Sequence, residues 1–260
     1  MRSTNPVLGE NVFSQSGAFA DGQVMTIQGT VNKCLILLAL VLVPALWVWS
    51  KIIQPAAPSV GYETPAAVSN PAAVIPFIFG GVIVGLIAAL ITVFKKEWAR
   101  VTAPIYAVAE GLVLGGISAI LEMRYHGIVM QAVGLTFGML FCLLMAYKAR
   151  IIRVTEKFRA GVVIATGAIA LLYLVTWILG MFHVNMPYIH DSGPIGIGIS
   201  LFIVGIAALN LLLDFDFIEQ GAEVGAPKYM EWYGAFGLMV TLIWLYMEIL
   251  NLLAKLRGRD

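Results

Sequence analysis

The chain has 260 residues, of which 60% are hydrophobic and only 12% are charged, and its mean hydropathy is +0.90. Soluble domains hold roughly 45–50% apolar and about 25% charged residues, so this composition excludes an ordinary soluble domain and predicts an integral membrane protein. The net charge of +1 comes without a basic stripe, which argues against a nucleic-acid partner.

Residues 1–32 are predicted to form a polar N-terminal tail, because no continuous apolar run of the signal-peptide kind follows Arg2. Residues 33–256 are predicted to form the membrane domain, and residues 257–260 a short tail. A membrane-spanning helix needs about 20 mostly apolar residues. The apolar runs predict seven helices, at about residues 34–50, 72–94, 101–121, 127–147, 161–182, 194–214 and 234–254.

Helices are expected because backbone polar groups in lipid must be satisfied within their own segment, and no segment alternates as barrel strands do. The sequence therefore predicts an all-α bundle. Cytoplasmic loops of membrane proteins carry an excess of lysine and arginine. Most of these residues fall on the cytoplasmic side if the N-terminus is cytoplasmic, so we expect that orientation, with the protein in the plasma membrane. Seven spans then place the basic tail "KLRGRD" outside, so six spans with one re-entrant segment is the alternative.

Glycines recur at four-residue spacing, which predicts close contacts between helices. The pairs are Gly81 with Gly85, Gly111 with Gly115, and Gly134 with Gly138.

Acidic residues within or at the end of the predicted helices are the candidate functional residues, since charge in lipid is costly. They are Glu110, Asp214, Asp216 and Glu248. No basic residue is predicted at the depth of Glu110 or Glu248. A carboxylate without a cation in a low-dielectric site tends to stay protonated, and two close together exchange protons as a pair. Their oxygens also suit a hard cation such as Ca²⁺.

Each of these acids has a structural alternative. Glu110 could be a protonated acid bonded to a backbone carbonyl, whereas Asp216, two positions after Asp214, favours a solvated interfacial place. The remaining acids of this region, Glu219, Glu223 and Glu231, are expected on loop surfaces.

Other chemistry has weak support. The predicted loop between the fifth and sixth helices is a weak candidate for a metal site, with His183, His190 and Asp191 as ligands. The two cysteines, Cys34 and Cys142, lie in separate apolar runs. No sequence motif assembles a nucleophile with a base, so no catalytic residue, enzyme activity or cofactor is expected.

Four segments in order resemble the Bax inhibitor-1 (TMBIM) family, with bacterial YccA-like members as the nearest branch. They are "YAVAEGLVLGGISAILE", "HGIVMQAVGLTFGMLFCLLMAYKARIIRVTEKFRAG", "LLLDFDFIEQGAEVGAPKY" and "WLYMEILNLLAKL". The resemblance implies seven helices with the last one central, and a calcium-leak channel gated by two acids. These acids correspond to Asp214 and Glu248. The second is aspartate in the family, and here the stretch between the two is longer by about two helical turns.

The expected function is therefore a pH-sensitive calcium leak. Asp214 and Glu248 would share a proton and hold the last two helices together, and Glu110 and Asp216 would line the pore or bind the ion. One alternative is a regulator of a membrane protease, or of another stress or cell-death protein in the bilayer, that transports nothing. The other is a proton-coupled cation exchanger.

Overall fold

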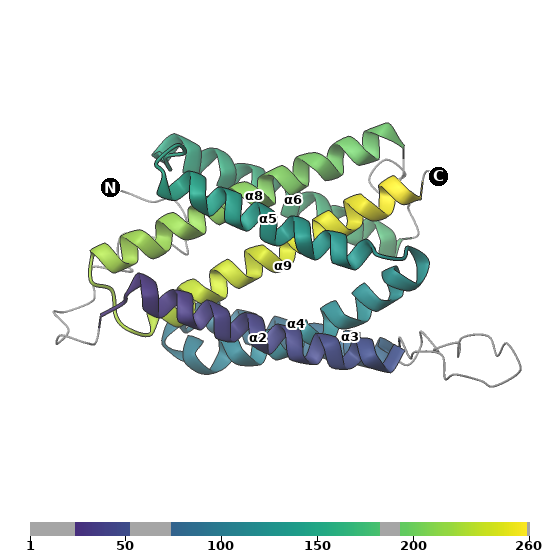
Figure 1. Ribbon diagram of the computed structural model, residues 1–260, viewed down its shortest axis with the longest axis horizontal. Helices are drawn as coiled ribbons and strands as arrows, with labels where there is room; N and C mark the ends of the chain where they lie inside the picture. The colour runs from purple at the N-terminus through teal and green to yellow at the C-terminus, as the bar shows by residue number, and fades with distance from the viewer. Residues whose placement is uncertain (1–23, 53–73, 183–192, 259–260) are drawn as a thin grey trace, which may run out of the picture. The chain divides into compact units, whose positions relative to one another are not determined.

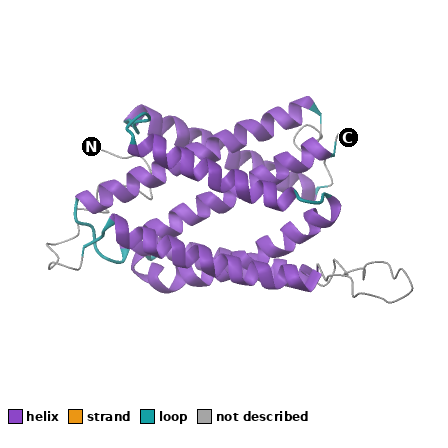
Figure 2. Cartoon of the chain, viewed as in Figure 1, coloured by secondary structure: helices purple, strands orange, loops and turns teal. Residues whose placement is uncertain are grey.

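The computed structural model describes residues 24–52, 74–182 and 193–258, and the regular elements in these ranges are helical (Figure 1). Figure 2 shows the same chain coloured by secondary structure. In chain order the elements are α2 (Ile27–Ile52), α3 (Ile75–Phe94), the 3₁₀ helix η2 (Lys96–Trp98), α4 (Ala99–Arg124), α5 (Ile128–Lys148), α6 (Glu156–Met181), α8 (Pro194–Glu223) and α9 (Met230–Arg257).

Seven helices in the described ranges are long and apolar enough to cross a membrane. This confirms the predicted all-α membrane fold with seven helices. The shortest of them has 20 residues, which is the length a bilayer requires, so helix length gives no support to a re-entrant segment.

Two helices, α2 and α8, extend well beyond their apolar runs. α2 begins at Ile27 instead of near residue 34, because the Thr26 hydroxyl accepts a 3.0 Å hydrogen bond from the backbone N–H of Gly29 and caps the first turn. α8 continues past residue 214 to Glu223, and its 30 residues make it about 45 Å long. This exceeds the roughly 30 Å of the hydrocarbon core, so its last turns can carry polar side chains.

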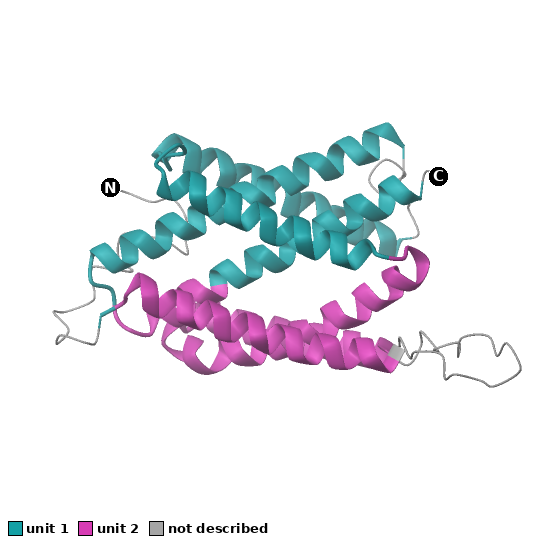
Figure 3. Cartoon of the chain, viewed as in Figure 1, with its two compact units in different colours: residues 1–24, 127–226, 237–260 teal, residues 25–126, 227–236 magenta. Residues whose placement is uncertain are grey.

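The chain divides into two compact units, where a single membrane domain was expected (Figure 3). One unit, called unit 2, contains residues 25–126 and 227–236, and thus α2, α3, η2, α4 and the first turns of α9. Unit 1 contains residues 1–24, 127–226 and 237–260, and thus α5, α6, α8 and the rest of α9. α9 therefore contributes residues to both units.

Glycines bring the backbones of unit 2 close together, as their spacing predicted. A Cβ atom added at Gly81, Gly111 or Gly115 would meet backbone atoms of neighbouring helices, and the residues met are Ala109, Val41 and Ala45 respectively. The predicted pair of Gly134 and Gly138 on α5 is different, because space is open around both residues in the described structure. Spacing alone does not separate glycines in a helix contact from glycines on a lipid-facing surface.

In unit 1, α8 and α9 pack antiparallel. Asp214, in the last third of α8, hydrogen-bonds to Thr241 of α9, while Ser200 near the start of α8 hydrogen-bonds to Lys255 at the far end of α9. An apolar cluster of Ile169, Ile203 and Ile206 joins α6 to α8. The candidate acids of α8 and α9 are thus held in one packed unit.

Candidate functional site

Asp214 lies on the face of α8 that packs against α9. Its side chain accepts a hydrogen bond from the Thr241 hydroxyl, and Gly237, one turn earlier on α9, leaves room beside its Oδ1. The Oδ2 atom is buried and has no hydrogen-bond partner among the described residues. Buried carboxylate oxygens are nearly always hydrogen-bonded in folded proteins, so an unpartnered one marks a place where a proton or ion can bind.

Glu248 forms a second acid site, within α9. The residue is only 6% exposed, and its Oε1 accepts a 2.6 Å hydrogen bond from the Tyr173 hydroxyl of α6 and a 3.1 Å bond from Nε1 of Trp244. Its Oε2 is buried, and no hydrogen-bond partner for it lies in the part of the chain that the structure describes. Within the described residues, neither Asp214 nor Glu248 forms an ion pair. This agrees with the expectation that no basic residue reaches the depth of Glu248.

The two acids have separate partners among the described residues, whereas we expected them to face or lie near each other and to share a proton. Thr241, which contacts Asp214, precedes Glu248 by seven residues, or about 10.5 Å along the axis of α9. Thr241, instead of the second acid, therefore lies opposite Asp214.

Glu110 lies in unit 2, on α4, and is half-buried. The Tyr106 hydroxyl, one turn earlier on the same helix, donates a hydrogen bond to it, and its Oε1 lies beside Gly85 of α3. The hydrogen-bond partner of Glu110 is therefore a tyrosine, whereas the structural alternative predicted a backbone carbonyl.

Asp216 is half-buried and paired, not a solvated interfacial residue as expected. Its Oδ2 lies 2.5 Å from Nη2 of Arg159, in the first turn of α6, and accepts a 2.6 Å hydrogen bond from Gln220. Its Oδ1 is 3.4 Å from the Tyr147 hydroxyl. With these partners, both oxygens of Asp216 are engaged.

Glu219 was expected on a loop surface, and this expectation was wrong. It lies within α8, where it accepts hydrogen bonds from the Tyr147 hydroxyl and, at 2.8 Å, from Arg150. The ends of α5, α6 and α8 are thus joined by Asp216, Glu219 and their partners.

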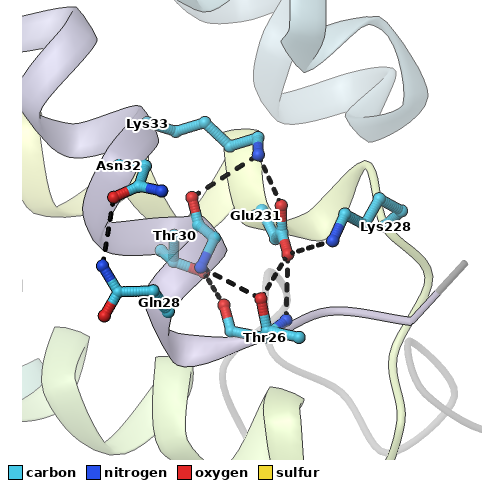
Figure 4. A network of polar contacts seen from close by, with 8 residues as sticks. Thr26, Gln28, Thr30, Asn32, Lys33, Lys228 and Glu231 are labelled. Atoms are coloured by element: carbon cyan, nitrogen blue, oxygen red, sulfur yellow. Dashed lines mark hydrogen bonds and ion pairs between the residues drawn. The ribbon is translucent and has the colours of Figure 1, made fainter. Parts of the chain in front are cut away.

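Glu231 was also expected on a loop surface, but it is fully buried in the first turn of α9 (Figure 4). Lys33 lies 2.6 Å from Oε2, and Lys228 lies 2.9 Å from Oε1. Thr26 donates to Oε1 from its backbone N–H at 3.0 Å and from its hydroxyl at 2.9 Å. Glu231 therefore ties the start of α2 to the start of α9 within unit 2.

The spacing of Lys228 and Glu231 was the one local signal for this cluster, since residues three apart become neighbours when they enter a helical turn. Tyr229, between them in sequence, stays neutral, because burial and the nearby Glu97 raise the pKa of its phenol.

A metal centre of ordinary protein ligands is not present in the described ranges, where no three His, Cys, Asp or Glu side chains gather. His183, His190 and Asp191 lie outside the described residues. Cys34 and Cys142 lie on different helices, α2 and α5, and are not joined by a disulfide.

Comparison with known proteins supports a family assignment. No curated protein and no solved structure matched the chain. The sequence does match the family described as Bax inhibitor 1 like over residues 5–258, which is nearly the whole chain. The chain belongs to the Bax inhibitor 1 like family.

Proposed function

We propose that the protein is a pH-sensitive calcium-leak channel in which Asp214 and Glu248 sense pH and bind Ca²⁺. The observation that carries this proposal is that each acid is packed between helices and keeps one buried carboxylate oxygen without a partner. A purely structural acid would have both oxygens satisfied, as Glu231 does. Family membership supports a membrane channel or regulator over an enzyme.

Desolvation, more than mutual repulsion, would drive opening. Two unit charges separated by about 10.5 Å, the rise from Thr241 to Glu248 along α9, would repel by about 1.6 kcal/mol at an effective dielectric of about 20. Burying one unpaired carboxylate costs several kcal/mol. Loss of either proton therefore favours a state in which water or a cation reaches the acid. In this mechanism α8 and α9 separate around each carboxylate in turn, and the two need not share a proton.

The test is Ca²⁺ flux into proteoliposomes containing the purified protein, measured across pH. The amide variants Asp214→Asn and Glu248→Gln mimic the protonated acids and are expected to hold the path closed. The proposal places the protein in the plasma membrane with its N-terminus in the cytoplasm, as the distribution of basic residues predicts.

A proton-coupled cation exchanger is the second candidate, and one observation favours it. Because Asp214 and Glu248 have separate partners, one could hold a proton while the other holds a cation. An exchanger would move Ca²⁺ in response to an imposed pH gradient, whereas a channel responds to pH itself. A protein that regulates a membrane protease without transport would show no flux in either condition.

A further inference from the structure

The helix α6 carries three polar residues on one face, at intervals of seven residues. They are Arg159, Thr166 and Tyr173. Each contacts a different polar group: Arg159 pairs with Asp216, Thr166 accepts a 2.8 Å hydrogen bond from Nδ2 of Asn210, and Tyr173 donates to Glu248. The other side of α6 is apolar and exposed, with residues such as Ile164, Leu171 and Trp177.

α9 carries a second polar stripe with the same interval, formed by Thr241, Glu248 and Lys255. Lys255 is only 7% exposed, and its Nζ donates to Oγ of Ser200 at 2.8 Å and to the carbonyl oxygen of Gly196 at 3.3 Å. A buried lysine in an apolar helix is as unusual as a buried acid.

The two stripes meet the polar residues of α8, and we call the combined set the polar seam. All of its members lie in unit 1: Arg159, Thr166, Tyr173, Ser200, Asn210, Asp214, Asp216, Thr241, Trp244, Glu248 and Lys255. From Ser200 to Asp216 the seam covers 17 residues of α8, a rise of about 24 Å, which approaches the roughly 30 Å of the hydrocarbon core.

Helix packing alone does not account for the seam. Hydrogen bonds between membrane helices contribute only about 0.6 kcal/mol each on average, so an apolar interface would hold α6, α8 and α9 together as well. The seam also contains the two buried oxygens without partners, and Glu248 is more than nine-tenths buried. Unpartnered carboxylate oxygens and a buried acid destabilise a purely structural interface. In a path for ions, the same groups can bind a cation.

We propose that the polar seam is the hydrated path along which cations cross the membrane, and that Lys255 closes its end remote from Asp214. This inference rests on the proposed function and names its route. Asp214 and Glu248 are the binding positions along the path, and Thr166, Asn210 and Tyr173 line the stretch beside them. The Lys255 ammonium occupies the end of the path at Ser200 and must leave before a cation passes.

Water access along the seam is tested by cysteine labelling, which does not depend on flux. Cys34→Ala and Cys142→Ala provide a cysteine-free background. Single cysteines are then placed at Ser200 and Asn210 on the seam and, as a control at intermediate depth, at Gly205, which is exposed with open space around it. A membrane-impermeant cationic methanethiosulfonate is applied to the reconstituted protein at acidic and neutral pH.

Labelling at Ser200 and Asn210 at either pH, without labelling at Gly205, is the expected result. No labelling at the two seam positions, or equal labelling at all three, would overturn the proposal. If the wild-type protein shows no Ca²⁺ flux, the channel function fails, and the labelling result alone then decides whether the seam is hydrated.

A flux experiment tests the route in a protein that leaks. Thr166→Val and Asn210→Leu remove polar groups from the seam and are expected to lower Ca²⁺ flux by about tenfold or more. The matched control is Thr136→Val on α5, because the Thr136 hydroxyl donates to the carbonyl oxygen of Ala132 within its own helix. Seam variants that leak as fast as Thr136→Val would contradict the route while leaving the channel function standing.

Discussion

The hydroxyl of Tyr173 on α6 lies 2.6 Å from Oε1 of Glu248 on α9, and this hydrogen bond fixes one oxygen of the acid while the other stays unpartnered. Tyr173 thus holds the acid in place and sets which oxygen can take up a proton or a cation.

Tyr173→Phe is therefore expected to lower Ca²⁺ flux by about tenfold, because Oε1 of Glu248 loses the donor that holds it in place. A hydrogen bond to a charged group contributes about 1.5 kcal/mol, which corresponds to roughly that factor. Tyr125→Phe, at the end of α4, is the control. Unchanged flux in Tyr173→Phe would show that this contact does not position the acid.

Glu231→Gln is expected to lower the free energy of unfolding by about 2 kcal/mol. Breaking a fully buried ion pair costs about 3–5 kcal/mol. We expect a smaller loss for Glu231→Gln because both lysine partners of Glu231 are partly exposed. Thermal unfolding in detergent measures the change. Glu223→Gln, an exposed acid at the end of α8, should unfold like the wild type. Equal stability of both variants would mean that the Glu231 cluster contributes little.

Gly29→Ala tests the Glu231 cluster by steric overlap. A methyl group at Gly29 would overlap the Glu231 carboxylate, so the variant must displace Glu231 and lose stability. Gly80→Ala on α3 meets open space, and alanine there should be neutral or slightly stabilising, by up to about 1 kcal/mol from helix propensity. The midpoint of thermal unfolding should fall in Gly29→Ala and stay unchanged or rise in Gly80→Ala. An equal shift in both variants would contradict the close approach of Gly29 to Glu231.

Lys255→Gln is expected to raise Ca²⁺ flux by about tenfold, because it removes a positive charge from the end of the seam. Lys255→Arg keeps the charge and should leak as slowly as the wild type. Flux that falls in Lys255→Gln would instead indicate that the lysine holds the open path together.

The sequence was sufficient to predict the fold and to identify Asp214 and Glu248 as candidate acids, because both predictions depend on local composition. Apolar runs of about 20 residues locate the seven helices, and Asp214 and Glu248 stand out as acids within or beside them. The partners of these acids were not predictable, since Tyr173 and Thr241 are ordinary residues of apolar helices until packing places them beside a carboxylate.

Glu231 shows why other polar residues were missed. Its main partner, Lys33, is 198 residues away in sequence, and only folding brings the two together. The same holds for Asp216 and Arg159, and for the helix ends that such contacts extend. Hydropathy reports how apolar a segment is. These contacts depend instead on which polar side chains a segment distant in sequence places beside it.

Ca²⁺ flux in proteoliposomes across pH, with the wild type beside Asp214→Asn and Glu248→Gln, tests the central claim most directly. The wild type should leak faster as pH rises, and each amide variant should leak about tenfold more slowly and lose its response to pH. A wild-type leak that both variants reproduce at every pH would contradict the assignment of these two acids as the gate.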